Sequence, residues 1–171
     1  MNKTFICFLV VFCCTVLPLS ACAFGTRPSD VWNFYHFDGT AFSPGPPSDG
    51  GAFIAVRHSL RPVVLTALTS SPEQTALPAG SGAIAGICYQ HSSGGKLGGG
   101  STVAPYPHVP VLVSSGGTQR VTVQTDDHGY FVVVLPEGTY SVAYGPSKTA
   151  VTVERGTTTL IPLRGGKRMV D

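Results

Sequence analysis

The chain has 171 residues, of which 21 are glycine and 14 are proline, and only 12% are charged. The formal net charge is +2 and the basic residues are scattered, so the sequence predicts no nucleic-acid partner and no surface that follows phosphates. Val and Thr recur in short runs between turn residues, a composition that favours short strands over helices.

The first segment is predicted to be a targeting signal rather than part of the fold. Lys3 precedes an apolar run, Phe5–Leu19, that is short for a membrane span. Residues 19–22 then read Leu-Ser-Ala-Cys, which resembles the bacterial lipobox. In that motif the signal is cut just before the cysteine, which then carries lipid. The resemblance implies a lipoprotein signal peptide at 1–21 and a lipid on Cys22.

A lipid on Cys22 would anchor the protein to a membrane, because each buried CH₂ contributes ~0.8 kcal/mol and two or three acyl chains hold stably. Ala23 rather than Asp follows the cysteine, which in Gram-negative lipoproteins leans towards sorting to the outer membrane. Ordinary secretion stays open, because Ala21-Cys22-Ala23 also fits a signal cleaved after Ala23. The folded part keeps Cys88 alone, so the sequence predicts no internal disulfide framework.

The rest of the chain divides by composition into five segments. Residues 22–31 are predicted to form a tether, 32–70 a β-rich segment, 71–81 a linker, 82–164 a β-sandwich and 165–171 a C-terminal tail. In the β-rich segment, Asp38-Gly39 between two apolar runs predicts a hairpin, because this dipeptide favours a tight turn with positive φ. Residues 91–108 are rich in glycine and are predicted to form a long flexible loop.

Six or seven short strands with frequent turns follow one another from Gly82, which is typical of a β-sandwich. Apolar and polar residues alternate along 121–124, 140–144 and 151–154, so these strands should bury one face and expose the other. The strand at 130–135 differs, because it is apolar on both faces. We expect residues 32–70 to cover its second face.

Four motifs in this region carry a family resemblance. They are Gly82-x-Ile84-x-Gly86-x-Cys88, Val-Pro-Val-Leu-Val at 109–113, Thr125-Asp126-Asp127-x-Gly129-Tyr130-Phe131, and Leu135-Pro136-x-Gly138-Thr139-Tyr140. Together they resemble the carboxypeptidase regulatory-like domain over residues 82–164. The resemblance implies an all-β fold, a seven-stranded transthyretin-like Greek-key β-sandwich of a kind common in exported bacterial proteins. Cys88 departs from the family, which usually has Val there, but a buried Cys is a small apolar side chain too.

The acidic pair beside His128 raises the question of an active site, but turn chemistry explains it. Asp side chains bond to their own backbone in turns and Gly supplies positive φ, so Asp126, Asp127 and Gly129 are predicted to form the turn between two strands. We expect a structural role for these residues.

The next turn is predicted at Pro136 and Gly138, with the proline fixing φ and the glycine taking the strained position. Tyr140 resembles the buried tyrosine that locks such corners through its hydroxyl. Two adjacent hairpins thus account for every special residue in this stretch.

Catalytic and metal-binding patterns find no support in the sequence. No G-x-S-x-G elbow occurs, and the Tyr-Arg-Gly-Ser ending of the transthyretin-like hydrolases is replaced by Leu-Arg-Gly-Gly. Cys88-x₂-His91 is a possible pair of metal ligands, but HExxH, CxxC and CxxCH motifs are absent from the sequence. The five histidines are therefore predicted to be solvated loop residues: His36, His58, His91, His108 and His128. We expect no enzyme, no cofactor and no metal.

These observations predict a non-enzymatic, lipid-anchored protein at the outer membrane or periplasmic face of a cell envelope. Its β-sandwich would serve as a binding or scaffolding module for protein partners, and a carbohydrate-binding accessory module is the alternative. A predicted contact surface comprises residues 91–108 and an aromatic group, Trp32, Phe34, Tyr35 and Phe37. Such aromatics more often fill a core than bind a ligand, so this second interpretation stays open.

Overall fold

A computed structural model describes residues 31–68, 72–93 and 101–169. In these ranges the chain forms twelve strands and no helix, which confirms the predicted all-β class. The strands are β1 (Asn33–Phe37), β2 (Phe42–Pro44), β3 (Phe53–Val56), β4 (Val63–Leu65), β5 (Ser81–Ser93), β6 (Ser101–Pro105), β7 (Pro110–Ser115), β8 (Thr118–Gln124), β9 (Tyr130–Pro136), β10 (Gly138–Tyr144), β11 (Ser147–Val153) and β12 (Thr158–Met169). A membrane-spanning helix is therefore not found among the described residues.

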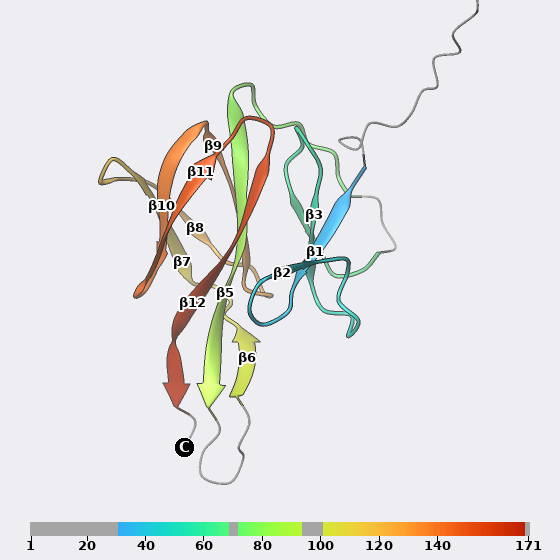
Figure 1. Cartoon of the computed structure of the whole chain (residues 1–171), viewed down its shortest axis with the longest axis vertical. Helices are drawn as coiled ribbons and strands as arrows, with labels where there is room; N and C mark the ends of the chain where they lie inside the picture. Colours follow the sequence, from blue (N-terminus) through green and yellow to red (C-terminus); the bar gives the residue numbers. More distant parts are fainter. Residues whose placement is uncertain (1–30, 69–71, 94–100, 170–171) are drawn as a thin grey trace, which may run out of the picture.

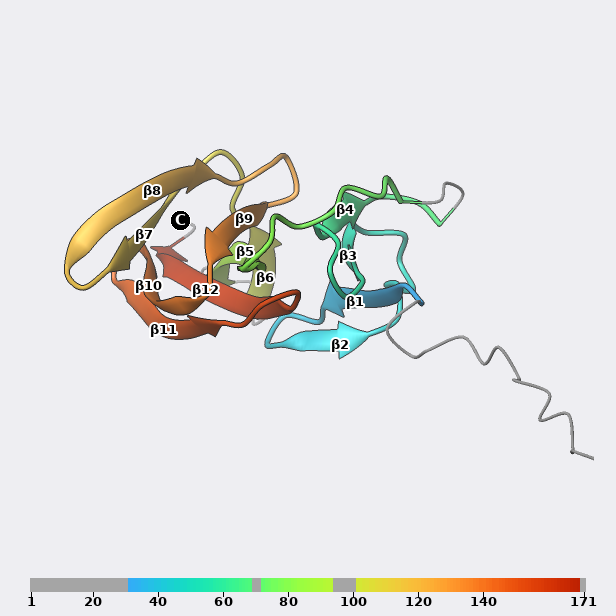
Figure 2. The same cartoon turned by 90° about the horizontal axis from the view of Figure 1, so that it is seen from above.

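The strands form three layers (Figures 1 and 2). An N-terminal sheet has the order β2-β1-β3-β4, and an outer sheet has the order β11-β10-β7-β8. The central sheet has the order β12-β5-β6, and β9 pairs with β5 as well. The central and outer sheets form a β-sandwich, and Figure 2 shows the N-terminal sheet beside it, against the central sheet.

The long strand β5 organises the central sheet. Its first half pairs with β9 and its second half with β6, both antiparallel, while β12 runs parallel along its other edge. Gly86 lies in the middle of β5, and a Cβ there would lie 2.6 Å from the ring of Phe131. A glycine at this position therefore lets the Phe131 ring and the Ile161 carbonyl oxygen of β12 approach the β5 backbone closely.

The sandwich core lies between the central and outer sheets. Side chains alternate along each strand, so every second residue of β7, β9, β10 and β11 points into this core. Its fully buried members include Ile84, Cys88, Val111, Val113, Val142 and Leu163. The apolar positions predicted from alternation at Val142, Val151 and Val153 are buried here.

A second core lies on the other face of the central sheet, under the N-terminal sheet. Its buried members are Ile54, Ala85, Ile87, Tyr89 and Tyr130. Val132 of β9 packs against this cluster, as do Phe37, Phe42 and Val64 of the N-terminal sheet. The prediction that residues 32–70 cover the second apolar face of the 130–135 strand is confirmed.

The strand count and two boundaries differ from the sequence prediction. The sandwich has eight strands, β5–β12, rather than seven, because residues 91–93 and 101–105 extend β5 and form β6. The prediction of a loop throughout 91–108 is therefore wrong for these residues. The strand β12 continues through a register shift after Arg164 to Met169, within the predicted tail. The pairing of β5 with β9 stops at Ile87, and beyond this residue β6 and β12 supply the partners that the β5 backbone requires.

The predicted linker is tied to the N-terminal sheet over part of its length. Ala76 forms a bridge with Leu60, and the Arg61 backbone N–H donates to the Thr75 carbonyl at 2.8 Å. The Leu77 N–H donates to the Ser59 carbonyl at 2.9 Å. These bonds satisfy backbone groups that a free linker would leave to water.

Candidate functional site

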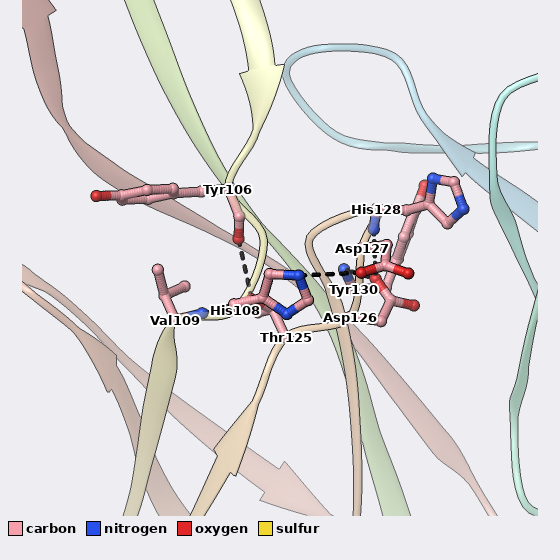
Figure 3. Close-up of polar contacts among 8 residues, drawn as sticks. All are labelled: Tyr106, His108, Val109, Thr125, Asp126, Asp127, His128 and Tyr130. Atoms are coloured by element: carbon pink, nitrogen blue, oxygen red, sulfur yellow. Dashed lines mark hydrogen bonds and ion pairs between the residues drawn. The ribbon is translucent and has the colours of Figure 1, made fainter.

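The turn between β8 and β9 uses Asp126 as its organiser (Figure 3). One carboxylate oxygen, Oδ1, accepts hydrogen bonds from the backbone N–H of His128 at 2.9 Å and of Tyr130 at 2.8 Å. The Gly129 N–H donates to the Asp126 carbonyl at 3.0 Å. A carboxylate that holds two backbone donors in place is committed to the turn.

Gly129 takes the position in this turn that a side chain could not occupy. Its φ is +77°, in the left-handed region that favours glycine. A Cβ would also lie 2.8 Å from the Cys88 carbonyl oxygen and 2.9 Å from the Tyr106 backbone nitrogen. The turn therefore packs directly on the backbone of the central sheet.

Asp127 pairs with a histidine of the neighbouring loop. Its Oδ1 lies 3.0 Å from Nε2 of His108, and the two side chains are 83% and 68% exposed. Exposed pairs of this kind contribute little to stability. The same two segments are joined more firmly by buried Thr125, whose hydroxyl donates to the Tyr106 carbonyl at 3.0 Å and accepts from the Val109 N–H at 2.9 Å.

The second predicted turn lies between β9 and β10. Gly138 has a φ of +154°, and the ring of Tyr140 would lie 3.6 Å from a Cβ placed on it. The Tyr140 hydroxyl donates to the Pro136 carbonyl at 2.9 Å, while the ring is buried in the sandwich core. This tyrosine ties the start of β10 to the end of β9.

A cavity of about 480 Å³ opens where the N-terminal sheet meets the sandwich. His128 lies on its wall, and Figure 3 shows this side chain directed away from Asp126 and Asp127. Opposite walls come from the segment 36–39 and the loop 47–52. Ile87 and Tyr130 of the central sheet also line the cavity.

Two loop carboxylates and a second histidine give this cavity a polar wall. Asp38 accepts hydrogen bonds from the backbone N–H of Ala41, the hydroxyl of Ser43 and the backbone N–H of Thr40, which together lower its pKa to about 2. Asp49 accepts one from the Gly51 N–H at 3.1 Å.

The second histidine, His36, is held from one side. Its Nδ1 lies 2.9 Å from the Gly45 carbonyl oxygen. Because a carbonyl can only accept, Nδ1 carries a proton, and in the neutral ring Nε2 keeps the acceptor lone pair.

The three residues 126–128 thus have three different surroundings. Asp126 serves the turn, Asp127 pairs with His108, and His128 lines the cavity. Gly129, Pro136, Gly138 and Tyr140 lie in the two corners, as described above. Cys22, the predicted lipidation site, lies outside the described residues.

Cys88 and His91, the possible pair of metal ligands, lie on opposite faces of β5. Cys88 is buried in the sandwich core, where burial raises its pKa to about 12. His91 lies three residues further along β5, so its side chain is on the other face of the strand. There it makes an edge-to-face contact with Tyr89 of the second core, with ring centroids 5.5 Å apart. Within the described ranges, groups of three or more residues placed to hold a metal ion are not found.

Sequence reasoning missed the cavity, although it named several of its residues. His36 of β1, Asp49 of the loop after β2 and His128 of the turn before β9 are far apart in the chain, and only the docking of the N-terminal sheet brings them together. The predicted aromatic contact group is largely used in packing. The Phe37 ring lies 4.6 Å from that of Tyr89, and the Phe34 ring lies 5.7 Å from that of Phe53.

Comparisons with known proteins do not assign the chain to a family. No protein-family profile matches the chain, and no curated protein matches it. Among solved structures, GBS52, a minor pilin of the Gram-positive pathogen Streptococcus agalactiae, is similar to it with 15% sequence identity and a TM-score of 0.38. The match covers 74% of this chain and 64% of the pilin, so the chain spans less than two thirds of that protein's length.

Proposed function

We propose that this chain is a non-catalytic binding protein of the cell envelope, exported and held at a membrane by lipid on Cys22. The acid and imidazole groups at 126–128 support a binding role over catalysis, because they diverge instead of converging on one point. General acid–base or nucleophilic chemistry needs partners within hydrogen-bond reach of each other and of a substrate.

The cavity between the layers is the observation that carries this proposal. Its volume of about 480 Å³ falls within the range of small-ligand sites, ~300–1,000 Å³. Its two walls are fixed relative to each other by the second core, and the Tyr130 hydroxyl donates to the Ala52 carbonyl at 2.9 Å across the junction. A preformed cavity lowers the ordering cost of binding, which favours recognition of a ligand.

Site-specific photo-crosslinking in the native envelope tests this proposal. A photoreactive residue at exposed Ser48, on the cavity rim, should capture a ligand reproducibly. The same residue at exposed Thr152 of β11, far from the cavity lining, is the matched control. Equal capture at both positions, or none at Ser48, would remove the cavity as the binding site.

The lipid anchor is tested separately. Mass spectrometry of the mature N-terminus should find an acylated Cys22, and the full chain should fractionate with membranes. The Cys22→Ser variant should leave the membrane fraction while keeping its fold. An unmodified Phe24 at the N-terminus would mean plain secretion and would end the anchor proposal.

A protein partner is the second candidate, favoured by the edges of the outer sheet. The edge strand β8 is largely exposed, with three consecutive exposed residues, Thr118, Gln119 and Arg120. An exposed strand edge offers backbone groups to a partner strand. A photoreactive residue at Gln119 should then capture a protein. Capture at Ser48 without capture at Gln119 would favour the cavity as the binding site.

A further inference from the structure

We infer that the cavity between the N-terminal sheet and the sandwich binds an uncharged, hydroxyl-rich ligand, a short segment of a glycan. This inference rests on the proposed binding function and names the ligand class of the same site. It depends on three properties of the cavity wall, which are its hydrogen-bonding groups, its apolar floor and its charge.

The hydrogen-bonding groups suit hydroxyls, each of which both donates and accepts. On Asp49, Oδ1 holds the Gly51 N–H at 3.1 Å, which orients the carboxylate so that Oδ2 can accept from a ligand hydroxyl. On His36, the Gly45 carbonyl fixes the proton on Nδ1, so Nε2 is an acceptor. The exposed ring of His128 adds a group that donates through one nitrogen and accepts through the other.

The floor of the cavity suits the C–H face of a sugar ring. Ile87 and Tyr130 are buried in the second core and line the cavity with half-buried Phe37 and Val103. The Phe37 ring is fixed by two neighbouring rings, since its centroid lies 4.6 Å from Tyr89 and 6.1 Å from Phe42. A rigid apolar floor beside polar rim groups is the common design of small-ligand sites.

The charge of the wall argues against an anionic ligand. Asp38 and Asp49 both line the cavity, whereas no Lys or Arg lies among its lining residues in the described part of the chain. The three hydrogen bonds on Asp38 keep that carboxylate ionised. The same bonds occupy most of its acceptor capacity, which makes it a poor partner for a Lys or Arg side chain.

Binding measurements on the mature full-length protein in detergent test the ligand class. The probes are neutral tetrasaccharides built from glucose, mannose, galactose or N-acetylglucosamine, with anionic oligosaccharides and a Lys/Arg-rich peptide as the other arms. A neutral tetrasaccharide should bind with an affinity that changes less than about twofold between low and physiological salt, because no ion pair is formed.

Three variants locate the binding. His128→Ala and Asp49→Asn should each weaken binding of the neutral tetrasaccharide by about tenfold, and Asp49→Asn keeps the Oδ1 acceptor for Gly51. His108→Asn is the matched control, because it removes an exposed histidine of the neighbouring loop that does not line the cavity. Asn is chosen there because His108 has a φ of +55°, which Asn tolerates.

The outcomes separate this inference from the proposed function. Binding of neutral tetrasaccharides that falls with His128→Ala and Asp49→Asn but not with His108→Asn supports both. If only the anionic sugars or the basic peptide bind, and His128→Ala and Asp49→Asn abolish that binding, the ligand class is wrong but the binding function stands. Absence of binding in every arm overturns the ligand class, and failure of crosslinking at Ser48 as well overturns the function.

Discussion

The hydroxyl of Tyr130 donates a hydrogen bond to the backbone carbonyl of Ala52, 2.9 Å away and 78 residues apart in the chain. The bond joins the first residue of β9 to the residue that precedes β3. It therefore crosses from the sandwich to the N-terminal sheet, at the floor of the cavity. Burial of the ring at this junction raises the pKa of Tyr130, so the hydroxyl stays protonated and able to donate.

Tyr130→Phe should lower the free energy of unfolding by about 1 kcal/mol, because the variant keeps the ring but leaves the Ala52 carbonyl without this donor. Hydrogen exchange should speed up in β1 and β3 more than in β7 and β10. Tyr140→Phe is the matched control, since it removes a hydroxyl-to-carbonyl bond confined to the sandwich. Equal exchange in the N-terminal sheet of both variants would mean that the Tyr130 bond does not hold the layers together.

The two adjacent aspartates should respond very differently to mutation. Asp126→Ala should cost about 2 kcal/mol of unfolding free energy, because the N–H groups of His128 and Tyr130 lose their acceptor. Asp127→Ala should change it by less than about 0.5 kcal/mol, because its pairing with His108 is exposed. Urea titrations of both variants measure the difference. Comparable losses would contradict the assignment of Asp126 alone to the turn.

Gly129 and Gly117 offer a matched pair of glycines with positive φ, +77° and +80°. Gly117→Ala should cost about 1 kcal/mol, because a Cβ there meets only the strain of the left-handed conformation. Gly129→Ala should cost about 1–3 kcal/mol more, because its Cβ would press on the Cys88 carbonyl and the Tyr106 nitrogen. Thermal or urea unfolding of the two variants checks this, and equal costs would remove the crowding argument.

Local signals in the sequence account for the parts of the fold that could be predicted. Alternation along 140–144 placed Tyr140 and Val142 in the core, because the strand period of two is independent of the partner strand. The strand at 130–135 is apolar on both faces, and leaving the face of Val132 in water would cost free energy. The sequence therefore predicted that another segment covers this face. Each of these inferences needs only neighbouring residues.

Features that depend on distant partners could not be predicted in the same way. The segment 101–105 is short, follows a glycine-rich stretch and ends at Pro105, so the composition around it favours a loop. It becomes a strand because the second half of β5 leaves backbone groups that need a partner. The cavity likewise depends on how His36, Asp49 and His128 meet after the sheets dock, for which the sequence carries no periodic signal.

The Asp38 carboxylate should titrate with a pKa of about 2 in the folded protein, below the usual value of 3.8. The main cause is the backbone N–H of Ala41, followed by the Ser43 hydroxyl and the Thr40 N–H. Because the folded pKa is lowered, the stabilisation from this carboxylate is complete above about pH 3.8 and is lost as the pH falls through about 2.

NMR of the Asp38 carboxyl carbon measures this pKa directly. Ser43→Ala should raise the midpoint towards the usual value, because it removes one donor and leaves the hairpin backbone in place. A midpoint near 3.8 in the unmodified protein would show that the hairpin hydrogen bonds are not formed in solution.

Cys88 should resist alkylation in the folded protein, because burial raises its pKa to about 12 and its side chain is fully buried in the sandwich core. The thiolate is the reactive form of a cysteine, so iodoacetamide at pH 8 should modify Cys88 only in molecules whose sandwich has unfolded. Because the folded pKa is raised, the contribution of this thiol to the free energy of unfolding is complete below the usual pKa of 9.0. That contribution is lost as the pH rises from 9.0 through about 12. Peptide mapping by mass spectrometry follows Cys88 separately from the other cysteines, and the same peptide in urea gives the reference rate. Alkylation of the folded protein at the urea rate would place Cys88 outside the core and would undo the register of β5 on which both cores depend.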